Sequence, residues 1–562
     1  GGFFRANLNR PKDLGNDQLI FSKGHAAPLL YALYAAAGKI SRRQLMTLRK
    51  YHSPLSGHPM SEFPYTVAPT GSLGQGLSVG AGISLANQKA RRASRVFVLL
   101  GDGEMAEGQV WEAMQFSSFH GLNHLVGILD VNRLGQSGPT MLGHNMQAID
   151  RRIASFGWRT VVIDGHDLGQ IKRAFRVAVS ATHRPTMIIA RTIKGKGVSF
   201  LENKLGWHGR ALSPTELPRA LDEIGPVGNK LRGVVRPAAI RRVRLMVRRK
   251  AKTFDYEPAQ LVAPRLAVGQ ALDRLAPAWP SMVVLDGDVA NSTFTELIRR
   301  GHRRQFLESY IAEQNMVSVA NGLAAAGLIP VTVTFAAFLT RAFDQLRMAH
   351  YASTHQIFIG SHIGVSIGQD GPSQMGLEDI AMFRTLGATI LYPSDAVSGQ
   401  RLTELALAGK GMVYLRSTRA ILPVLYKKAS AFRIGGSAVL RRHRDDRATI
   451  VAAGVTLHEA LRAADDLQKS GVQVRVIDLY SIQPLDVRTV YRAVEETKHL
   501  IVVEDHVSAG GIAEAVRSAL GDSARVISLA VRKTPRSGSP EQLLADQGID
   551  APAIKDCVLS LL

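Results

Sequence analysis

Short apolar runs alternate with helical stretches along most of the chain. In the first half, the runs that predict buried strands are Val96–Leu100, Leu125–Val131, Val161–Asp164 and Met187–Ala190, and the stretch Glu107–Phe119 predicts a helix. Such alternation predicts a parallel sheet with helices on both faces. Ligands of these sheets bind beyond the carboxyl ends of the strands, so we expect functional residues there.

Two further blocks repeat this alternation. The second starts near Pro264, and the third begins after about Ala431. From about Ala211 to Pro264 the sequence is rich in Arg, Pro and Gly without a firm apolar period, which predicts a connector. The strands predicted in the two later blocks are Met282–Leu285, Val331–Phe335, Gln356–Gly360, Thr449–Ala453, Val472–Ile477 and Leu500–Val503. The pattern therefore predicts an α/β chain with mainly parallel sheets.

Composition places the chain among ordinary soluble globular proteins, with 562 residues, 46% of them hydrophobic and 20% charged. Cys557 is the one cysteine, so no disulfide forms within the chain, and a reducing compartment such as the cytoplasm fits best. No charged side chain lies between Glu313 and Arg341. Polar residues and Pro330 interrupt this stretch, which predicts a buried helix ending near Gly327 and then a strand, and disfavours a membrane span.

The formal net charge is +23, and part of it lies in one dense run. A solvated linker face is the preferred interpretation of this run, and a phosphate or nucleic-acid patch is the alternative. No aromatic residues are interleaved with the basic ones, which argues against nucleic-acid binding. The run consists of Arg241, Arg242, Arg244, Arg248, Arg249, Lys250 and Lys252.

Two predicted strands end in oxygen-bearing side chains. The sequence Gly101-Asp102-Gly103-Glu104 follows one strand, and Asn132 ends the next. Both would lie at the same edge of a parallel sheet, and the glycines allow close approach of the backbone to a ligand. Carboxylate and amide oxygens suit Mg²⁺, which shares phosphate oxygens with its ligand. This pattern predicts a diphosphate anchored through a metal, although an ordinary tight turn is the alternative.

Glu313 opens the charge-free stretch. Burial there would favour the protonated form of its carboxyl group and suit a proton exchange with a heterocycle nitrogen. A carboxylate stabilised by the helix dipole is the alternative.

Four histidines have glycine neighbours, which indicates backbone turns that direct imidazoles into a cleft. Their spacings match no zinc pattern. A glycine-punctuated loop at 364–374 is either a surface loop or a ligand loop, and Arg416 and Arg419 are candidates for gripping a phosphate. The histidines are His25, His58, His208 and His362.

No Gly-x-x-x-x-Gly-Lys-Ser/Thr loop and no Gly-x-Ser-x-Gly elbow occur, so nucleotide and serine hydrolysis lack their usual motifs. The chain instead resembles the transketolase family, in its vertebrate-type branch, along nearly its whole length. The likeness is carried by SKGHAAP (22–28), TGSLGQGL (70–77), LLGDGEMAEGQVWEAM (99–114), ILDVNRLGQS (128–137), WHG (207–209), DGDVANSTF (286–294), YIAEQNMVS (310–318), TFAAFLTRAFDQ (334–345) and GSHIGVSIGQDGPSQM (360–375).

The resemblance implies three consecutive α/β domains and a homodimer. The expected limits are a diphosphate-binding domain at 1–235, a linker at 236–263, a pyrimidine-binding domain at 264–428 and a C-terminal domain at 429–562. Each active site would combine the diphosphate domain of one subunit with the pyrimidine domain of the other. The implied activity is reversible transfer of a two-carbon ketol unit, from a ketose phosphate of the xylulose 5-phosphate type to an aldose phosphate of the ribose 5-phosphate type, in the pentose phosphate pathway.

The implied cofactors are thiamine diphosphate and Mg²⁺, with Ca²⁺ or Mn²⁺ as substitutes. The cofactor would act as the electron sink for the carbanion formed on carbon–carbon cleavage. By resemblance, Glu313 would hydrogen-bond the pyrimidine ring and favour the imino tautomer that deprotonates the thiazolium ring. Asp102, Asn132 and the backbone carbonyl of Leu134 would bind the metal. Gly71, Ser72, Leu73, Gly103, Asn132, Lys194, His208, His25, Phe338 and Gln374 would contact the cofactor.

For the substrate, the resemblance implies that histidines contact or shuttle protons to sugar hydroxyls, namely His25, His58, His208 and His362. Asp370 would bind a donor hydroxyl, and Arg265, Ser292 and Arg419 would hold the substrate phosphate. Two alternatives stay open: a relative that acts on another sugar phosphate, and a catalytically impaired binding or regulatory partner.

The impaired-partner alternative follows from one departure from the family pattern. Family members usually carry an upstream Gly-Ser-Gly-His-Pro segment, and this sequence starts downstream of it. The sequence is truncated, another chain supplies the segment, or the protein lacks it, and in the last case we expect weak or lost catalysis.

Overall fold

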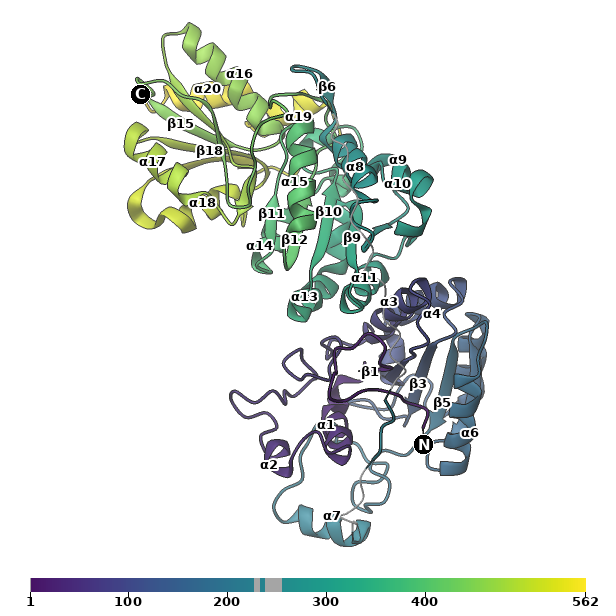
Figure 1. Cartoon of the computed structure of the whole chain (residues 1–562). Helices are drawn as coiled ribbons and strands as arrows, with labels where there is room; N and C mark the ends of the chain where they lie inside the picture. Colours follow the sequence, from purple (N-terminus) through teal and green to yellow (C-terminus); the bar gives the residue numbers. More distant parts are fainter. Residues whose placement is uncertain (1, 227–232, 238–254) are drawn as a thin grey trace. The chain divides into compact units, whose positions relative to one another are not determined.

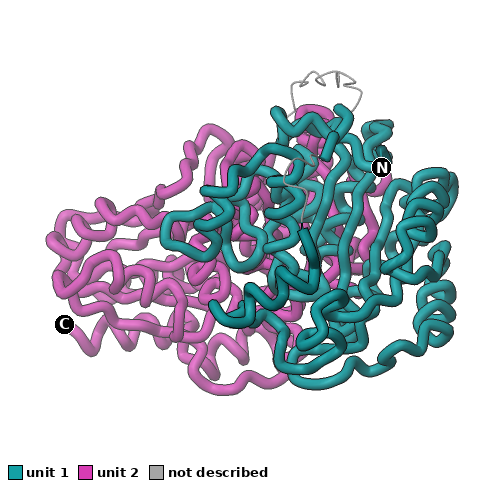
Figure 2. The backbone as a smooth tube through the Cα atoms, turned by 90° about the horizontal axis from the view of Figure 1, so that it is seen from below, with its two compact units in different colours: residues 1–245, 317–328 teal, residues 246–316, 329–562 magenta. Residues whose placement is uncertain are grey.

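The computed structural model describes residues 2–226, 233–237 and 255–562 (Figure 1). The chain divides into two compact units, which Figure 2 shows in teal and magenta. The first unit comprises residues 1–245 with 317–328, and the second comprises 246–316 with 329–562. The basic run near residue 245 lies outside the described residues.

The first unit is built on a sheet whose strand order is β1-β2-β3-β5-β4, and every neighbouring pair is parallel. The central strands are almost wholly buried, because helices cover them and remove the alternation of polar and apolar positions. The strands are β1 (Gln18–Phe21), β2 (Val96–Gly101), β3 (Leu125–Val131), β4 (Arg159–Asp164) and β5 (Thr186–Arg191). Four predicted strands are confirmed, and β1 was not predicted.

Helices complete this unit. Residues Gly76 to Asn87 of helix α3 (Gly76–Lys89) are all buried. Helix α4 (Gly108–Phe119) confirms the predicted helix, while α5 (Met146–Ser155) and α6 (Leu168–Val179) pack on strand β4. The interpretation of 211–264 as a mere connector is wrong in part, because α7 (Glu216–Ile224) forms there with only Ala220 buried. Its larger apolar residues Leu217, Leu221 and Ile224 recur at helical spacing but are exposed.

The second unit contains two larger sheets. The first has the order β17-β11-β12-β10-β9-β7-β8 and is parallel except for β17, which pairs with β11 in the antiparallel sense. Its strands are β7 (Met282–Asp286), β8 (Phe306–Glu308), β9 (Ile329–Phe335), β10 (Gln356–Ser361), β11 (Thr389–Leu391), β12 (Met412–Arg416) and β17 (Ser481–Gln483). Since β17 comes from the C-terminal part of the chain, it ties that part to this sheet.

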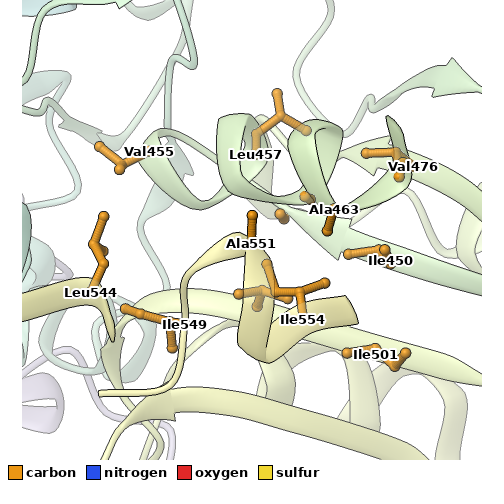
Figure 3. Packing of buried hydrophobic residues seen from close by; sticks show 14 of the residues in the cluster. Ile450, Val455, Leu457, Ala463, Val476, Ile501, Leu544, Ile549, Ala551 and Ile554 are labelled. Carbon is orange, nitrogen blue, oxygen red and sulfur yellow. The ribbon is translucent and has the colours of Figure 1, made fainter. Parts of the chain in front are cut away.

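The other sheet has the order β14-β16-β15-β18-β19, with β14 antiparallel to β16. Its strands are β14 (Ala438–Arg441), β15 (Ala448–Ala452), β16 (Val474–Asp478), β18 (Leu500–Val507) and β19 (Val526–Val531). Figure 3 shows its apolar core, where Leu457 of helix α16 (Val455–Lys469) and Ile554 of α20 (Ala551–Leu559) are fully buried with Ile450 and Ile501. A ribbon of β6 (Leu261–Val262) and β13 (Leu422–Pro423) completes the sheets described in this unit.

The charge-free stretch after Glu313 folds as predicted, as helix α11 (Glu313–Ala325) followed by strand β9. Across the described ranges, none of the helices combines the length and the apolar character that crossing a bilayer requires.

Candidate active site

The edge of the first sheet brings Asp102 and Asn132 together, as their positions after β2 and β3 predict. Oδ2 of Asp102 accepts hydrogen bonds from the Arg133 backbone N (2.6 Å) and from Oγ1 of Thr140 (3.1 Å). Oδ1 of Asn132 accepts from the backbone N of Leu134 at 3.1 Å. Arg133 adopts the left-handed backbone conformation (φ 62°), which turns the chain sharply after Asn132. The two loops are therefore fastened to each other through Asp102.

This edge presents one carboxylate, one amide oxygen and the carbonyl of Leu134. That carbonyl already receives a cation, because the ammonium group of Lys194 lies 3.1 Å from it. Within the described ranges no three His, Cys, Asp or Glu side chains are grouped as metal ligands. Hard oxygen donors with few charges suit Mg²⁺ that shares its coordination with phosphate, so the residues fit that ion.

Lys194 continues into a chain of imidazoles. Its ammonium nitrogen lies 3.0 Å from Nδ1 of His208, and Nε2 of His208 lies 3.0 Å from Nδ1 of His25. The rings of His25 and His58 have centroids 4.9 Å apart. The structure thus brings together three of the four histidines that the glycine pattern singled out.

Burial and neighbouring positive charges favour the neutral forms of these three imidazoles. Burial, followed by the charge of Lys194, lowers the pKa of His208, and burial followed by Arg49 lowers the pKa of His25. Burial likewise lowers the pKa of His58, with His25 as the next cause. The pKa of Lys194 is lowered by burial and then by the charge of Lys23. Neutral imidazoles in a row are able to accept and to pass on protons.

Glu104 is a positioning residue that the sequence analysis missed. It is 3% exposed, and its carboxylate accepts from the backbone N of Gly74 (2.8 Å), the backbone N of Gly101 (3.1 Å) and the hydroxyl of Ser22. Burial raises its pKa although these hydrogen bonds oppose that shift. Its place in GDGE was visible, but two of its three partners, Gly74 and Ser22, lie in distant segments, so local spacing did not reveal its role.

The segments 22–28 and 70–77 meet closely behind the histidines. A Cβ atom at Gly24 would lie 2.7 Å from Cα of Gly71, whose φ is +126°. Such contact between backbones leaves no space for any side chain. Of the other predicted cofactor residues, Ser72 is partly buried, Leu73 is 37% exposed, and Gly103 is exposed at the start of the turn Gly103–Ala106.

In the second unit, Glu313 begins α11 and is 2% exposed. Its Oε2 accepts a hydrogen bond from Nη1 of Arg341 at 2.5 Å. The predicted burial is confirmed, and Arg341 is a partner that the sequence analysis did not anticipate.

An aromatic stack follows strand β9. The ring of Phe335 stacks on Phe338 (centroids 5.2 Å apart) and on the imidazole of His362 (3.7 Å). His362 is 3% exposed, and burial lowers its pKa to about 3, helped by Arg265 and Arg419. Its imidazole is therefore neutral at any physiological pH. Gln374, half-buried, ends the turn Pro372–Gln374.

The predicted phosphate residues lie beside His362. Nη1 of Arg265 donates to the carbonyl of Ser292 (2.6 Å) and lies 3.4 Å from Nε2 of His362, while its Nε is buried without a partner. Burial and the charge of Arg419 lower the pKa of Arg265. Arg419 pairs with Asp370 at 2.6 Å. The neighbouring guanidinium groups of Arg265 and Arg419 favour an anionic ligand.

Arg416 is not available for a phosphate, which corrects that candidate. It is fully buried, and its Nε donates to Asp379 at 2.7 Å. The interpretation of 364–374 as a surface loop is wrong for its first half, because residues 364–368 are buried. A buried guanidinium needs such a carboxylate partner, which the sequence around Arg416 does not reveal.

Parallel α/β sheets, an edge with hard-oxygen donors and a buried helix-initiating glutamate agree with the thiamine-diphosphate-binding class that the family resemblance implies. Residues 2–230 match the family described as transketolase, thiamine diphosphate binding domain. Residues 260–424 match the transketolase pyrimidine binding domain, and residues 436–554 match the transketolase C-terminal domain. The chain therefore belongs to the transketolase family.

Individual proteins that are similar to this chain support its place in the transketolase family. Human transketolase is 44% identical over 561 residues, which cover 98% of this chain and 90% of the relative. Mouse transketolase-like protein 2 is also 44% identical, with the same coverage of both chains. The transketolase from Campylobacter jejuni subsp. jejuni NCTC 11168 has the same fold, with a TM-score of 0.86 at 23% identity, over 99% of this chain and 93% of that one.

Proposed function

We propose that the chain transfers a two-carbon ketol unit reversibly between sugar phosphates, from a ketose such as xylulose 5-phosphate to an aldose such as ribose 5-phosphate. The observation that carries this proposal is Glu313, a glutamate 2% exposed that begins a helix and is held by Arg341. A carboxyl group enclosed in this way is shielded from water. It is therefore suited to exchanging a proton with the ring nitrogen of a bound ligand.

Thiamine diphosphate, when bound, supplies an electron sink for the electron pair released on carbon–carbon cleavage. We assign Mg²⁺ to Asp102, Asn132 and the carbonyl of Leu134, with Ca²⁺ or Mn²⁺ as substitutes. Glu313 is assigned the hydrogen bond to the pyrimidine ring. The remaining cofactor contacts are assigned to Gly71, Ser72, Leu73, Gly103, Asn132, Lys194, His208, His25, Phe338 and Gln374.

We assign substrate binding to two groups of residues, the histidine row of the first unit and the residues around His362 in the second. The neutral row His208, His25 and His58 passes protons to and from sugar hydroxyls, since its pKa values are lowered below the ordinary range. Arg265 and Arg419, with Ser292, hold the substrate phosphate, and the unpartnered Nε of Arg265 is one donor for it. His362 and Asp370 bind sugar hydroxyls.

The proposal also covers the oligomeric state, the domain limits, the cell compartment and the pathway. We assign a homodimer in which the diphosphate domain (1–235) of one subunit works with the pyrimidine domain (264–428) of the other, joined by a linker at 236–263 and followed by a C-terminal domain at 429–562. A single cysteine fits a cytoplasmic setting, and the reaction fits the pentose phosphate pathway.

A second candidate rests on the relatives. Transketolases and transketolase-like proteins match this chain at similar identity, 44% in each case for human transketolase and mouse transketolase-like protein 2. A relative with another sugar-phosphate specificity, or a binding partner with impaired catalysis, is therefore the alternative.

The test is a ketol-transfer assay on the full-length protein with thiamine diphosphate and Mg²⁺. We expect transfer from xylulose 5-phosphate to ribose 5-phosphate, dependent on both cofactors and restored by Ca²⁺ or Mn²⁺ after chelation. A panel of other ketoses and aldoses identifies altered specificity. Tight cofactor binding with no turnover on any pair would contradict the enzyme and support the impaired partner.

A further inference from the structure

The loop at 362–377, between β10 and α14 (Asp379–Thr385), presents three of the proposed substrate and cofactor residues: His362, Asp370 and Gln374. Its ends are drawn together, because Gly364 N donates to the carbonyl of Gly376 at 2.8 Å. What holds this loop in place is the C-terminal part of the chain.

Asp505, on strand β18, is fully buried beneath the start of the loop. Its Oδ1 accepts from the backbone N of Val365 at 2.7 Å, and its Oδ2 accepts from the backbone N of Ser366 at 3.3 Å. Gly364 has φ +71°, and a Cβ atom there would lie 2.0 Å from Oδ2 of Asp505. The glycine therefore lets the loop descend onto the carboxylate.

The other end of the loop is fastened to the same strand. Nη2 of Arg416 donates to the carbonyl of Gly376 (3.2 Å) and to the carbonyl of Asp505 (2.9 Å). The backbone N of Val507 donates to the carbonyl of Leu377 at 3.1 Å. One stretch of β18 thus contacts both ends of the loop.

Apolar packing adds to these polar contacts. Four side chains of the loop are buried in the hydrophobic core of the C-terminal sheet, together with Leu544 and Ile549, both labelled in Figure 3. These four are Val365, Ile367, Met375 and Leu377. The loop is therefore folded as part of the C-terminal core, while Asp370 at its exposed turn reaches Arg419.

We propose that Asp505 is a positioning residue for the substrate: through two backbone N–H groups it fixes the 362–377 loop, and thereby the place of Asp370 and His362 against the sugar phosphate. This inference rests on the proposed function, because His362 and Asp370 are substrate residues only if that function holds. It gives the C-terminal domain a part in substrate binding. Asp505 is fully buried, so it acts through the backbone of the loop rather than at the substrate itself.

The chain offers a matched control in Asp478. This carboxylate is also fully buried in the C-terminal sheet, and it also accepts hydrogen bonds from preceding parts of the chain, Ser394 Oγ (2.9 Å) and Tyr426 Oη (2.6 Å). Among the described residues these side-chain hydrogen bonds go to Ser394 and Tyr426 rather than to the 362–377 loop, so Asp478→Asn tests loss of a buried carboxylate without loss of the loop contact.

The experiment compares Asp505→Asn and Asp478→Asn in the cofactor-loaded full chain. Asparagine keeps the shape of aspartate but replaces one acceptor with a donor that opposes an N–H group. We expect Asp505→Asn to raise KM for the ketose phosphate about tenfold, the ratio for a loss of about 1.4 kcal/mol, with thiamine diphosphate affinity unchanged. Asp478→Asn should leave KM within about twofold of the parent.

Hydrogen exchange supplies a readout independent of activity. The amides of Val365 and Ser366 should exchange about tenfold faster in Asp505→Asn and at the parental rate in Asp478→Asn. Equal exchange of these amides in both variants would overturn the inference, whether or not the parent transfers ketol units. A parent without transfer but with the expected exchange would overturn the proposed function alone. If Asp505→Asn fails to fold, Gly364→Ala disturbs the same contact from the loop side and should raise KM likewise.

Discussion

The histidines of the two units differ in surroundings, although both groups have lowered pKa values. His25, His58 and His208 lie near a lysine in a partly open row, whereas His362 is buried between Phe335 and Arg265. Burial lowers the pKa of His362 to about 3, far below the working range of an acid–base group. The comparison teaches that the first unit suits proton movement, while His362 is suited to fixed hydrogen bonding.

The largest effect is expected at the buried glutamate of the second unit. Glu313→Gln removes the carboxyl group that is assigned the proton exchange but keeps the size of the side chain, so kcat for ketol transfer should fall about 1,000-fold. Thiamine diphosphate should still bind, as measured by fluorescence titration. The matched control is Glu296→Gln, which changes another glutamate in the first turn of a helix, α10 (Glu296–Gly301), that pairs with Arg300. Loss of activity in both variants alike would contradict a specific role for Glu313.

A smaller effect is expected in the open row. His208→Ala breaks the link between Lys194 and His25, and kcat should fall about 10- to 100-fold, less than for Glu313 because neighbouring imidazoles remain. The pH dependence of kcat/KM should change as well. His183→Ala, at an exposed histidine of the same unit, is the control and should match the parent. An unaltered pH profile in His208→Ala would argue against proton transfer through the row.

The last prediction concerns stability rather than rate. Because the folded pKa of His362 is about 3 and the ordinary value is 6.5, the unfolded chain binds one more proton between these pH values. The stability that neutral His362 maintains is complete above pH 6.5 and is lost as pH falls toward 3, at about 1.4 kcal/mol per pH unit.

Denaturant unfolding of the parent and of His362→Gln at several pH values measures this loss. The variant should show a shallower decline between pH 6 and 4, since glutamine takes up no proton. His183→Gln is the control and should decline as the parent does. Parallel curves for parent and His362→Gln would show that His362 is not held neutral by burial.

Much of the fold was predictable, because apolar runs report buried strands directly. Val96–Leu100 and Leu125–Val131 matched observed strands within one residue, and the Val472–Ile477 strand began two residues later than predicted. Strand β1 and helix α7 are among the elements that were missed, as are short or edge strands such as β8, β11, β14 and β19. Helix α7 does carry Leu217, Ala220, Leu221 and Ile224 at helical spacing, but this short stripe lies in a segment rich in Arg, Pro and Gly and was not recognised as a helix.

The candidate site was predictable in its residues more than in its partners. Asp102 and Asn132 follow neighbouring strands, and their proximity follows from the parallel sheet alone. Glu104 and Arg341 were overlooked, since their importance depends on contacts with segments distant in sequence. Arg416 was misjudged for the same reason, as its carboxylate partner lies 37 residues earlier.

The sequence by itself determined the alternation of strands and helices, the residues at the strand ends and the family resemblance, because these depend on local periodicity and short motifs. Only the tertiary structure decided which charged groups are buried, which histidines share one cluster and which strand holds the 362–377 loop. The carboxylate of Asp505 meets Val365 across 140 positions of the chain, and no local pattern encodes a hydrogen bond between residues so far apart.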